Sequence, residues 1–407
     1  MPEPLHPPKP IVMNRRTVDL AIVGGGLAGG LIALAIQRAC PQMSLALFDA
    51  GEQLGGNHRW SWFSSDLDAA GSTLMGDFAT RDWQTGNAVR FPAHDRELAA
   101  NYRSLASCDF DAALRRILPT SAICTAQRVS SLDADGLEMA NGERVSAQRV
   151  IDCRTFEPTR HLTGGWQVFL GRHLRTKTPH GVERPIIMDA DVAQHGAYRF
   201  VYTLPLAADE LFVEDTYYAD HPDLDATVLS QRIDAYSHAN GWVGEEIGRE
   251  TGVLPVITGG DFSAYRQQIA IPGVAIAGAR GGFSHPLTSY TVPIAVRTAL
   301  LIARNADLSG PELASLVERE ATKHWQATRF YRFLGQMLFG AGAPEDRFRI
   351  FERFYRLPEP LIERFYAARS TTGDKLRILA GKPPVPIAGA IRALLGNQPP
   401  LVHEENQ

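Results

Sequence analysis

Three glycines spaced as Gly24-x-Gly26-x-x-Gly29 indicate a chemistry more directly than any other residues of this chain. The apolar stretch over residues 18–23 predicts a buried strand before them, and the apolar run over residues 31–36 predicts a helix after them. In such a unit Gly24 permits the tight turn, Gly26 lets the backbone approach a pyrophosphate, and Gly29 lets helix and strand pack closely. The spacing therefore predicts a phosphate-binding turn.

The residues around this turn complete a dinucleotide-binding unit. Leu27 and Ala28 lie between the second and third glycines, ahead of the expected helix, and are predicted to contact the cofactor. The N-terminus of that helix favours the negative charge of a phosphate. Asp49 ends a second expected strand 20 residues after Gly29, where a carboxylate accepts hydrogen bonds from a ribose hydroxyl. We therefore predict a dinucleotide site; the alternative is a glycine-rich turn without a ligand.

A second glycine-rich segment, Gly55, Gly56 and His58, comes soon after that strand. With the first unit close to the N-terminus and a long chain following it, this arrangement resembles the FAD-binding proteins of the glutathione-reductase and aromatic-hydroxylase type. The resemblance implies FAD rather than NAD, with the second glycine-rich segment passing near the flavin.

The composition argues against several other classes of protein. The 407 residues carry a net charge of −4, which gives no indication of nucleic-acid binding. Four widely spaced cysteines form no Cys-x-x-Cys pair, which argues against a metal site or a disulfide framework and is typical of a reducing cytosol. Residues 20–36 lack charges but carry glycines at phosphate-loop positions, so we predict a βαβ unit there and no membrane span.

The C-terminal part of the chain is basic and aromatic. Residues 321–390 hold twelve Lys/Arg against six Asp/Glu, together with ten Phe and Tyr residues. Interleaved basic and aromatic residues on helices suit the surface of an anionic membrane. The alternative, weighed equally, is a helical subdomain with aromatic side chains in its core and arginines on its surface.

Hydrophobic periodicity predicts the rest of the organisation. Short strands over 128–154 return to a parallel sheet, strands with turn signals over 165–220 predict a mostly antiparallel sheet, and 224–240 predicts a helix. Residues 273–282 predict a buried strand ending in glycines, followed by a helix over 287–303.

The predicted fold class is therefore α/β: an FAD-binding Rossmann-type (glutathione-reductase/aromatic-hydroxylase-like) domain, an inserted, mostly antiparallel β substrate domain and a C-terminal helical region. The expected segments are a disordered tail at 1–17, a discontinuous FAD-binding domain at 18–158 and 250–305, a substrate domain at 159–249, a membrane-facing helical region at 306–398 and a tail at 399–407.

Several blocks of residues are distinctive in type and spacing. They are Gly24-x-Gly26-x-x-Gly29, Gly55-Gly-Asn-His58-x-Trp60, Pro185-Ile-Ile-Met-Asp-Ala190, Tyr198-Arg-Phe-Val-Tyr202, Val213-Glu-Asp-Thr216, His285-Pro-x-Thr-x-Tyr290, and a long block from Phe354 to Pro386. Together they resemble the bacterial lycopene β-cyclases, a branch of the FAD-binding fold, over about residues 18–390. Ser289 departs from the pattern, which implies glycine at that position.

The resemblance implies an isomerase of carotenoid biosynthesis that cyclises the ψ-ends of lycopene to β-ionone rings, giving β-carotene through γ-carotene. It implies FAD that is active in its reduced form, NAD(P)H as the electron source and no net redox change. A second cofactor contact is implied at Gly278, His285, Pro286, Ser289 and Tyr290. The resemblance also implies a cytoplasmic protein held peripherally at the inner face of the cell membrane, where other carotenoid-pathway enzymes are possible partners.

Cyclisation of an alkene needs a strong, positioned acid, because an alkene is a poor base, and a carboxylic acid qualifies. Glu214 and Asp215 are the candidate catalytic carboxyl groups. Because side chains alternate along a strand, we expect these two to lie on opposite faces, and the sequence leaves open which of them faces the substrate. The resemblance favours Glu214, with Asp215 in a structural or supporting role; the alternative is a solvent-facing acid pair.

Two other kinds of function share these features. A flavin-dependent monooxygenase or prenyl reductase would use the same fold and consume NAD(P)H stoichiometrically. A non-catalytic isoprenoid-binding protein would have no need of the dinucleotide residues. His58 and His285 are predicted to be hydrogen-bond anchors beside the cofactor rather than catalytic groups.

Overall fold

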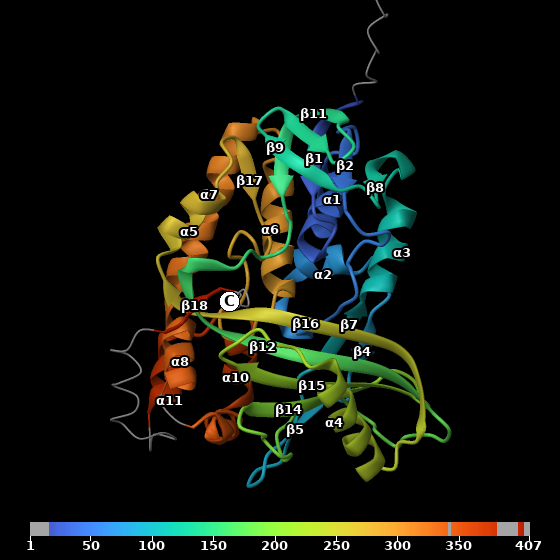
Figure 1. The fold of residues 1–407 in the computed structure, drawn as a ribbon, viewed down its shortest axis with the longest axis vertical. Coiled ribbons are helices and arrows are strands. Elements are labelled where there is room, and N and C mark those ends of the chain that lie inside the picture. Colours follow the sequence, from blue (N-terminus) through green and yellow to red (C-terminus); the bar gives the residue numbers. More distant parts are fainter. Residues whose placement is uncertain (1–15, 341–342, 381–397, 403–407) are drawn as a thin grey trace, which may run out of the picture.

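The computed structural model describes residues 16–340, 343–380 and 398–402 (Figure 1). Most of the predicted N-terminal tail, residues 381–397 of the predicted helical region, and residues 403–407 lie outside this description. Within the described residues the strands form three sheets, of seven, eight and three strands.

The seven-stranded sheet has a parallel centre. Its strands, in spatial order, are β8 (Ile123–Cys124), β2 (Leu45–Phe48), β1 (Arg16–Val23), β11 (Arg144–Asp152), β10 (Gly136–Met139) and β9 (Val129–Asp133), with β17 (Val274–Ile276) also pairing with β11. β8, β2, β1, β11 and β17 run parallel, whereas β9 and β10 are antiparallel. Parallel strands place their carboxyl ends at one edge, where open α/β sheets bind ligands.

Alternation along β1 gives the sheet two apolar faces. Leu20 and Ile22 belong to the core under the helices, whereas Ala21 and Val23 belong to the core on the other side. The helix face is covered by α1 (Leu27–Ala39) and α6 (Val292–Arg304), which pack against each other, and by α7 (Gly310–Ala327) (Figure 1). These helices hold the glycine-rich turns at the carboxyl edge of the sheet.

The eight-stranded sheet lies below the first in Figure 1 and is almost entirely antiparallel. Its strands, in spatial order, are β16 (Gly244–Gly260), β12 (Thr159–Thr176), β15 (Glu210–Ala219), β14 (Tyr198–Pro205), β13 (Ile186–Asp189), β5 (Asn87–Arg90) and β6 (Arg96–Leu98), with β18 (Pro400–Leu401) on β12. One face packs on α4 (Ala226–Ala239), whose N-terminus is capped by the Asp225 carboxylate. The other face looks into the molecule.

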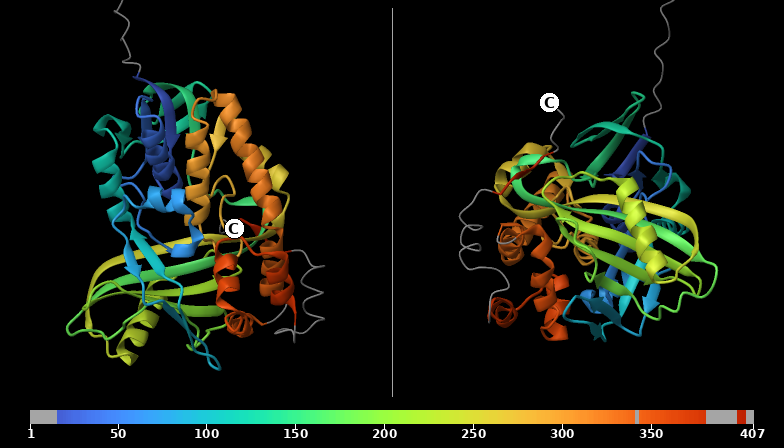
Figure 2. Two further views of the ribbon diagram at one scale, coloured as in Figure 1. Left: turned by 180° about the vertical axis from the view of Figure 1, so that it is seen from behind. Right: turned by 60° about the horizontal axis from the view of Figure 1, so that its bottom comes forward.

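The inner face of this sheet is covered by the third sheet and by the C-terminal helices (Figure 2). The third sheet consists of β3 (Arg59–Phe63), β7 (Tyr102–Ala106) and β4 (Arg81–Trp83). The remaining helices are α2 (Ala69–Met75), α3 (Ser107–Ile117), α5 (Phe262–Ile269), α8 (Arg329–Gly340), α9 (Phe348–Phe354), α10 (Glu359–Tyr366) and α11 (Thr372–Leu379), with single turns at η1 (Ser64–Asp66), η2 (Thr120–Ala122) and η3 (Pro344–Asp346).

Several predicted boundaries differ from the structure. The boundary expected at residue 250 falls inside β16, an edge strand whose glycines and Pro255 conceal the strand pattern. β5 and β6, expected in the FAD-binding segment, belong to the eight-stranded sheet. Residues 400–401 of the expected terminal tail pair with β12. β1 starts at Arg16, two residues before the expected domain start.

The helix expected over 287–303 begins only at Val292. The preceding residues form a turn in which the imidazole Nδ1 of His285 accepts the N–H groups of Leu287 and Thr288 at 3.3 and 3.2 Å. Ser289 has φ +55°, a left-handed conformation that a helix cannot contain. These local hydrogen bonds therefore delay the start of the helix from residue 287 to Val292.

The aromatic residues of the C-terminal region are mostly core residues. Tyr331, Tyr355, Phe365 and Tyr366 are buried against the inner face of the eight-stranded sheet. Phe351 on α9 stacks on Tyr198 of that sheet, with ring centroids 4.4 Å apart. For these side chains the structure agrees with the alternative of an aromatic helical core, not with insertion into a membrane.

Candidate active site

A cavity of about 550 Å³ opens at the carboxyl edge of the seven-stranded sheet. Eight of the predicted cofactor residues line it: Gly24, Gly26, Leu27, Ala28, Asp49, Gly56, His58 and Gly278. They come from the turns after β1 and β17, from the end of β2 and from the segment before β3. The parallel strands thus bring together residues that lie up to 254 positions apart in the chain.

The three glycines of the first turn meet three different steric demands. Gly24 has φ +101°, and an added Cβ would lie 2.5 Å from the carbonyl oxygen of Cys153. An added Cβ at Gly29 would lie 2.0 Å from the carbonyl oxygen of Gly24, so Gly29 packs inside the turn and does not line the cavity. At Gly26 nothing lies within 4 Å of that position, which leaves an open cradle at the N-terminus of α1. An open cradle of backbone N–H groups fits a pyrophosphate.

Asp49 stands where β2 ends, and its carboxylate organises the backbone around the cavity. Oδ2 accepts the N–H of Gly25 at 2.6 Å and Oδ1 accepts the N–H of Gly51 at 2.8 Å. Both contacts leave further acceptor capacity on a carboxylate that lines the cavity. Asp49 can therefore serve the ribose contact that its spacing predicts.

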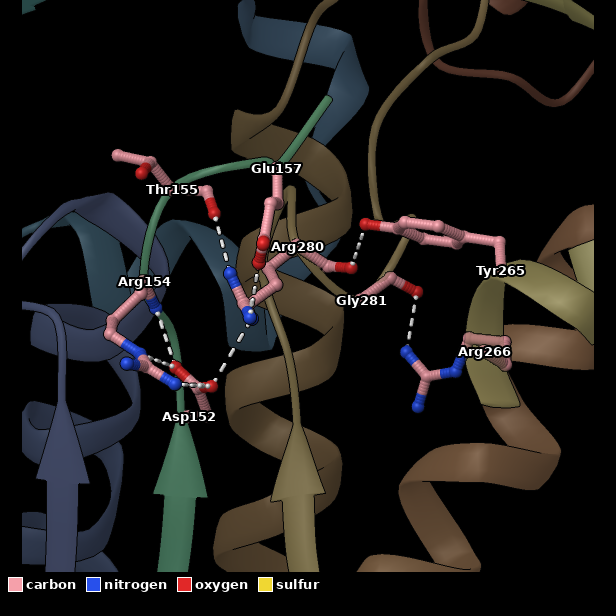
Figure 3. A network of polar contacts seen from close by, with 8 residues as sticks. All are labelled: Asp152, Arg154, Thr155, Glu157, Tyr265, Arg266, Arg280 and Gly281. Atoms are coloured by element: carbon pink, nitrogen blue, oxygen red, sulfur yellow. Dashed lines mark hydrogen bonds and ion pairs between the residues drawn. The ribbon is translucent and has the colours of Figure 1, made fainter. Parts of the chain in front are cut away.

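A network of ion pairs beside the cavity was not predicted from the sequence (Figure 3). The carboxylate of Asp152, which is fully buried at the end of β11, forms ion pairs with the guanidinium groups of Arg154 at 2.8 Å and Arg280 at 3.2 Å. Arg280 also reaches Glu157 at 2.7 Å, which joins the loop after β11 to the loop after β17. Charge-assisted contacts of this kind fix loop positions, and these two loops frame the cavity.

Two residues of α5 form hydrogen bonds to the loop after β17. The hydroxyl of Tyr265 donates to the carbonyl oxygen of Arg280 at 2.7 Å, and Arg266 donates to that of Gly281 at 3.1 Å. No local spacing rule links these residues, because the partners come from separate elements.

A second cavity of about 240 Å³ adjoins the first. His58, Trp60 and Thr291 line both, so the two cavities meet at these three residues. The floor of the second cavity is the inner face of the eight-stranded sheet, and its walls come mainly from β3, β7 and the turn before α6. Aromatic side chains dominate its lining: Trp60, Tyr102, Phe169, Phe200, Tyr202, Tyr218, Tyr290, Phe351 and Tyr366.

Glu214 is the carboxylic acid that lines this cavity. The sheet register pairs it with Tyr202 on β14 and with Gly171 on β12. Its Oε1 accepts the hydroxyl of Thr216 at 2.6 Å, and no ion pair to it is found within the described residues. Burial raises the pKa of Glu214 to about 7, so a protonated carboxylic acid is available near neutral pH.

Asp215 lies on the opposite face of β15 and does not line the cavity. Its two oxygens accept from the guanidinium Nε of Arg199 at 3.0 and 2.9 Å, and both side chains are buried. Strand alternation therefore removes Asp215 from contact with any ligand in the cavity and leaves it with a structural ion pair. Its expected place among the catalytic residues is corrected accordingly.

Hydroxyl groups form a connected chain along the cavity wall. The Tyr102 hydroxyl lies 2.6 Å from that of Tyr290 and 3.2 Å from that of Tyr202. Tyr202 also donates to Ser61 at 2.8 Å, and Ser61 donates to Ser104 at 3.0 Å. The hydroxyls of this chain are thus bonded to one another, whereas Gln167 Oε1 and Thr288 Oγ1, also in the lining residues, have no hydrogen-bond partner among the described residues.

The structure places the residues of the predicted second cofactor contact in different parts of the site. Ser289 and Tyr290 line the aromatic cavity, whereas His285 and Pro286 line neither cavity. His285 is fully buried; its Nε2 donates to the carbonyl oxygen of Phe365 at 3.1 Å, and burial lowers its pKa to about 3. A neutral imidazole with both nitrogens engaged anchors the turn. Burial lowers the pKa of His58 as well, although its ring borders both cavities.

Glu250 on β16 is a further acid close to Glu214. Its side chain is 7% exposed, and burial raises its pKa to about 8, with the Glu214 charge as the second cause. The surrounding sequence is polar and rich in glycine, so only the pairing of distant strands reveals the proximity. No cluster of His, Cys, Asp and Glu suited to a metal ion occurs in the described part of the chain.

Comparison with known proteins first defines the class. A geranylgeranyl bacteriochlorophyll reductase-like protein from Thermoplasma acidophilum has a similar structure, with a TM-score of 0.62, 12% identity and coverage of 94% of this chain and 99% of the other. The fold is thus the FAD-binding Rossmann type that the sequence predicts, with an added antiparallel sheet and C-terminal helices.

Sequence comparison then gives the family. The family model described as lycopene cyclase protein matches residues 19–392, and the chain belongs to this family. The lycopene β-cyclase of Pseudescherichia vulneris is 44% identical over 94% of this chain and 98% of its own length. That of Pantoea ananas is 39% identical over 93% of this chain and 98% of its own length.

Proposed function

We propose that this protein is a lycopene β-cyclase, which converts the ψ-ends of lycopene to β-ionone rings and so forms γ-carotene and then β-carotene. Membership of the family supports this activity. The observation that carries the chemistry is Glu214, a half-buried acid that lines an aromatic cavity beside the dinucleotide cavity and has no ion pair among the described residues.

The reaction requires three steps that these residues can perform. Glu214 transfers its proton to the terminal double bond, which forms a C–H bond and leaves a tertiary carbocation. An inner double bond attacks that cation to close the ring. Loss of one ring proton to the Glu214 carboxylate restores the acid and a double bond, so atoms and electrons balance without an oxidant.

The cavity lining stabilises the cation and excludes water. Trp60, Phe200 and Tyr202 present aromatic faces, and a cation over such a face is stabilised by ~0.5–2 kcal/mol or more when desolvated. Water would trap the cation as an alcohol, and the aromatic side chains of the lining favour its exclusion.

FAD fits the first cavity through the Gly26 cradle, the Asp49 carboxylate and the loop at Gly278. When bound there in its reduced form, FAD would supply negative charge that stabilises a carbocation. NAD(P)H is the proposed electron source for keeping it reduced. His58, Trp60 and Thr291, shared by the two cavities, separate this group from the substrate.

Expression in a lycopene-accumulating bacterium tests the activity. Pigment analysis is expected to give γ-carotene and β-carotene with the mass of lycopene. Accumulation of unchanged lycopene by a yellow, folded protein would contradict the proposal, and a colourless protein would indicate an isoprenoid-binding role instead.

A turnover measurement separates cyclisation from a monooxygenase or prenyl-reductase activity on the same fold. Under anaerobic conditions, enzyme reduced chemically and then freed of reductant is expected to cyclise many equivalents of lycopene without NAD(P)H. One turnover for every two electrons would identify a redox enzyme.

We further propose that the enzyme works at the cytoplasmic membrane surface, where its substrate dissolves and other carotenoid-pathway enzymes could supply it. Among the described helices, none is long and apolar enough to cross a membrane. Leu376 and Leu379 on α11 are 65% and 45% exposed, and Lys375 and Arg377 flank the first of them. Exposed leucines beside basic residues suit an anionic lipid surface.

Sedimentation with vesicles tests membrane binding. Binding is expected to rise with anionic lipid and fall with salt, since each basic residue near the surface contributes about 1 kcal/mol. Leu376→Asp with Leu379→Asp should weaken it, and so should charge reversal at Arg349, Arg353 and Arg356. Equal pelleting with neutral and anionic vesicles would show that these residues only solvate the helical region.

A further inference from the structure

Glu214 has a second carboxyl group as its neighbour across one strand of the sheet. β12 lies between β15 and β16, and its Gly171 is paired with Glu214 on one side and with Glu250 on the other. Directly opposite residues of antiparallel strands project to the same face. Both glutamates therefore project into the inner face, on either side of a residue that has no side chain.

The missing side chain at Gly171 leaves room on the inner face, between the two acids, for the Phe212 ring and for the Glu250 side chain. An added Cβ there would lie 3.2 Å from Cγ of Glu250 and 2.2 Å from Cζ of Phe212. The Glu250 side chain thus lies beside Gly171, the residue that separates it from Glu214, and the Phe212 ring lies over the same glycine. Two strand spacings of about 4.8 Å are within the combined reach of two glutamate side chains.

The charged groups around this pair do not neutralise it. Burial and the Glu214 charge raise the pKa of Glu250 more than the charge and the backbone N–H of Arg59 on β3 lower it. The Arg59 guanidinium lies 5.7 Å from the Phe212 ring centroid and donates to Ser104 at 3.3 Å. His173, two residues from Gly171, contacts Glu210, and burial lowers its pKa. Neither Glu214 nor Glu250 has an ion pair among the residues that the structure describes.

We propose that Glu214 and Glu250 act as a carboxyl pair that holds one proton, with Glu250 as a positioning residue that keeps Glu214 in its acid form. This rests on the proposed function and adds a residue to it. Two carboxyl groups on one face of a sheet, both poorly solvated, cannot both ionise readily, so a negative charge on one favours the proton on the other. After each proton transfer to the substrate, the pair regains the ring proton and returns to the same charge.

The pH dependence of β-ring formation tests the pair with Glu250→Gln. Removing the like charge lowers the pKa of Glu214, so the alkaline decline in rate should move to lower pH by about one unit. The rate should fall ~10-fold at about pH 8 and less than ~2-fold at about pH 6. Glu250→Asp keeps a titrating group and should restore most of the profile, and Glu245→Gln on the exposed part of β16 should leave it unchanged.

Two outcomes would overturn the pair. One is a Glu250→Gln profile identical to that of the wild type, and the other is an equal loss of rate at every pH, which would mean a packing role only. Infrared titration of the protein provides a second readout: the wild type should lose its two carboxyl protons in two separate steps around neutral pH, with the singly protonated pair between them. Glu250→Gln should lose one proton in a single step at lower pH. This readout decides the pair even if the wild type forms no β-rings, a result that would refute the proposed function alone.

Discussion

Glu214 and Asp215 are chemically similar neighbours on one strand, yet the fold gives them opposite environments. Glu214 faces an aromatic cavity, accepts one hydroxyl hydrogen bond and has no ion pair within the described residues. Asp215 faces the core under α4 and binds the guanidinium of Arg199 through both of its oxygens. Burial raises the pKa of both groups, but for Asp215 the ion pair opposes that rise.

The comparison shows that burial alone does not leave a carboxyl group free of an ion pair. A buried carboxyl group becomes a proton donor near neutral pH only where no cation stabilises its charged form. Consecutive side chains of a strand point to opposite faces of the sheet. Two neighbouring residues on one strand can therefore occupy such different environments. One carboxyl group is thereby available for chemistry and the other for stability.

The largest expected effect is the loss of activity in Glu214→Gln. The amide keeps the shape of the side chain and removes the proton donor, so β-ring formation should fall ~10²–10⁴-fold. Bound FAD and the melting temperature should stay close to those of the wild type, as visible absorbance and calorimetry can check. A rate within ~10-fold of wild type would assign the acid to another residue.

The matching change on the other face, Asp215→Ala, should act on stability instead. It leaves the Arg199 charge buried and unpaired, which costs about 3–5 kcal/mol of the free energy of unfolding, as urea denaturation can measure. Arg199→Met combined with Asp215→Leu should recover much of that loss. If folded Asp215→Ala lost activity as completely as Glu214→Gln, the division of roles between the two faces would be refuted.

The pH dependence of the wild type follows from the pKa of Glu214. Because burial raises it to about 7, the group is a loaded acid below that pH, and the rate should decline as pH rises through about 7. The same shift makes the ionised form unfavourable in the folded state, so stability should also fall as pH rises from about 4.5 to about 7, and less so in Glu214→Gln. Rates that increase steadily above pH 7 would indicate a general base.

The smallest expected effect lies across the cavity, at Ser289. Its Oγ donates to the carbonyl oxygen of Pro255 at 2.9 Å while its backbone adopts φ +55°. Ser289→Ala loses that bond and keeps the strained backbone, so it should cost about 1 kcal/mol of stability. Ser289→Gly should cost less, because glycine adopts positive φ freely. Thermal unfolding of the two variants gives the order, and a more stable alanine variant would contradict this account.

The sequence predicted the parts of the molecule that depend on local spacing. The Gly24 turn, Asp49 and the alternation of Glu214 and Asp215 follow from rules that operate over a few residues, and the structure places them accordingly. The glycine implied at position 289 has a physical reason in the left-handed backbone found there.

The contacts that the sequence did not predict join distant strands and loops. Glu250 reaches the neighbourhood of Glu214 only through β12, and Arg280 reaches Asp152 only because β17 pairs with β11. The start of α6 was misplaced because His285 and Ser289 form a local turn that hydrophobic periodicity does not register. Contacts of this kind depend on how distant segments pair in the fold, and residue types along the sequence do not reveal them.

Cyclisation of lycopene in deuterated water tests the central claim, that a protein acid starts the reaction without net redox change. A carboxylic acid exchanges its proton with solvent between turnovers, so each new β-ring should gain one deuterium on the carbon that the acid protonates. Mass spectrometry of the product should show γ-carotene with one deuterium and β-carotene with two. Rings formed without deuterium, or with a label that follows the hydride of NAD(P)H instead, would contradict the account.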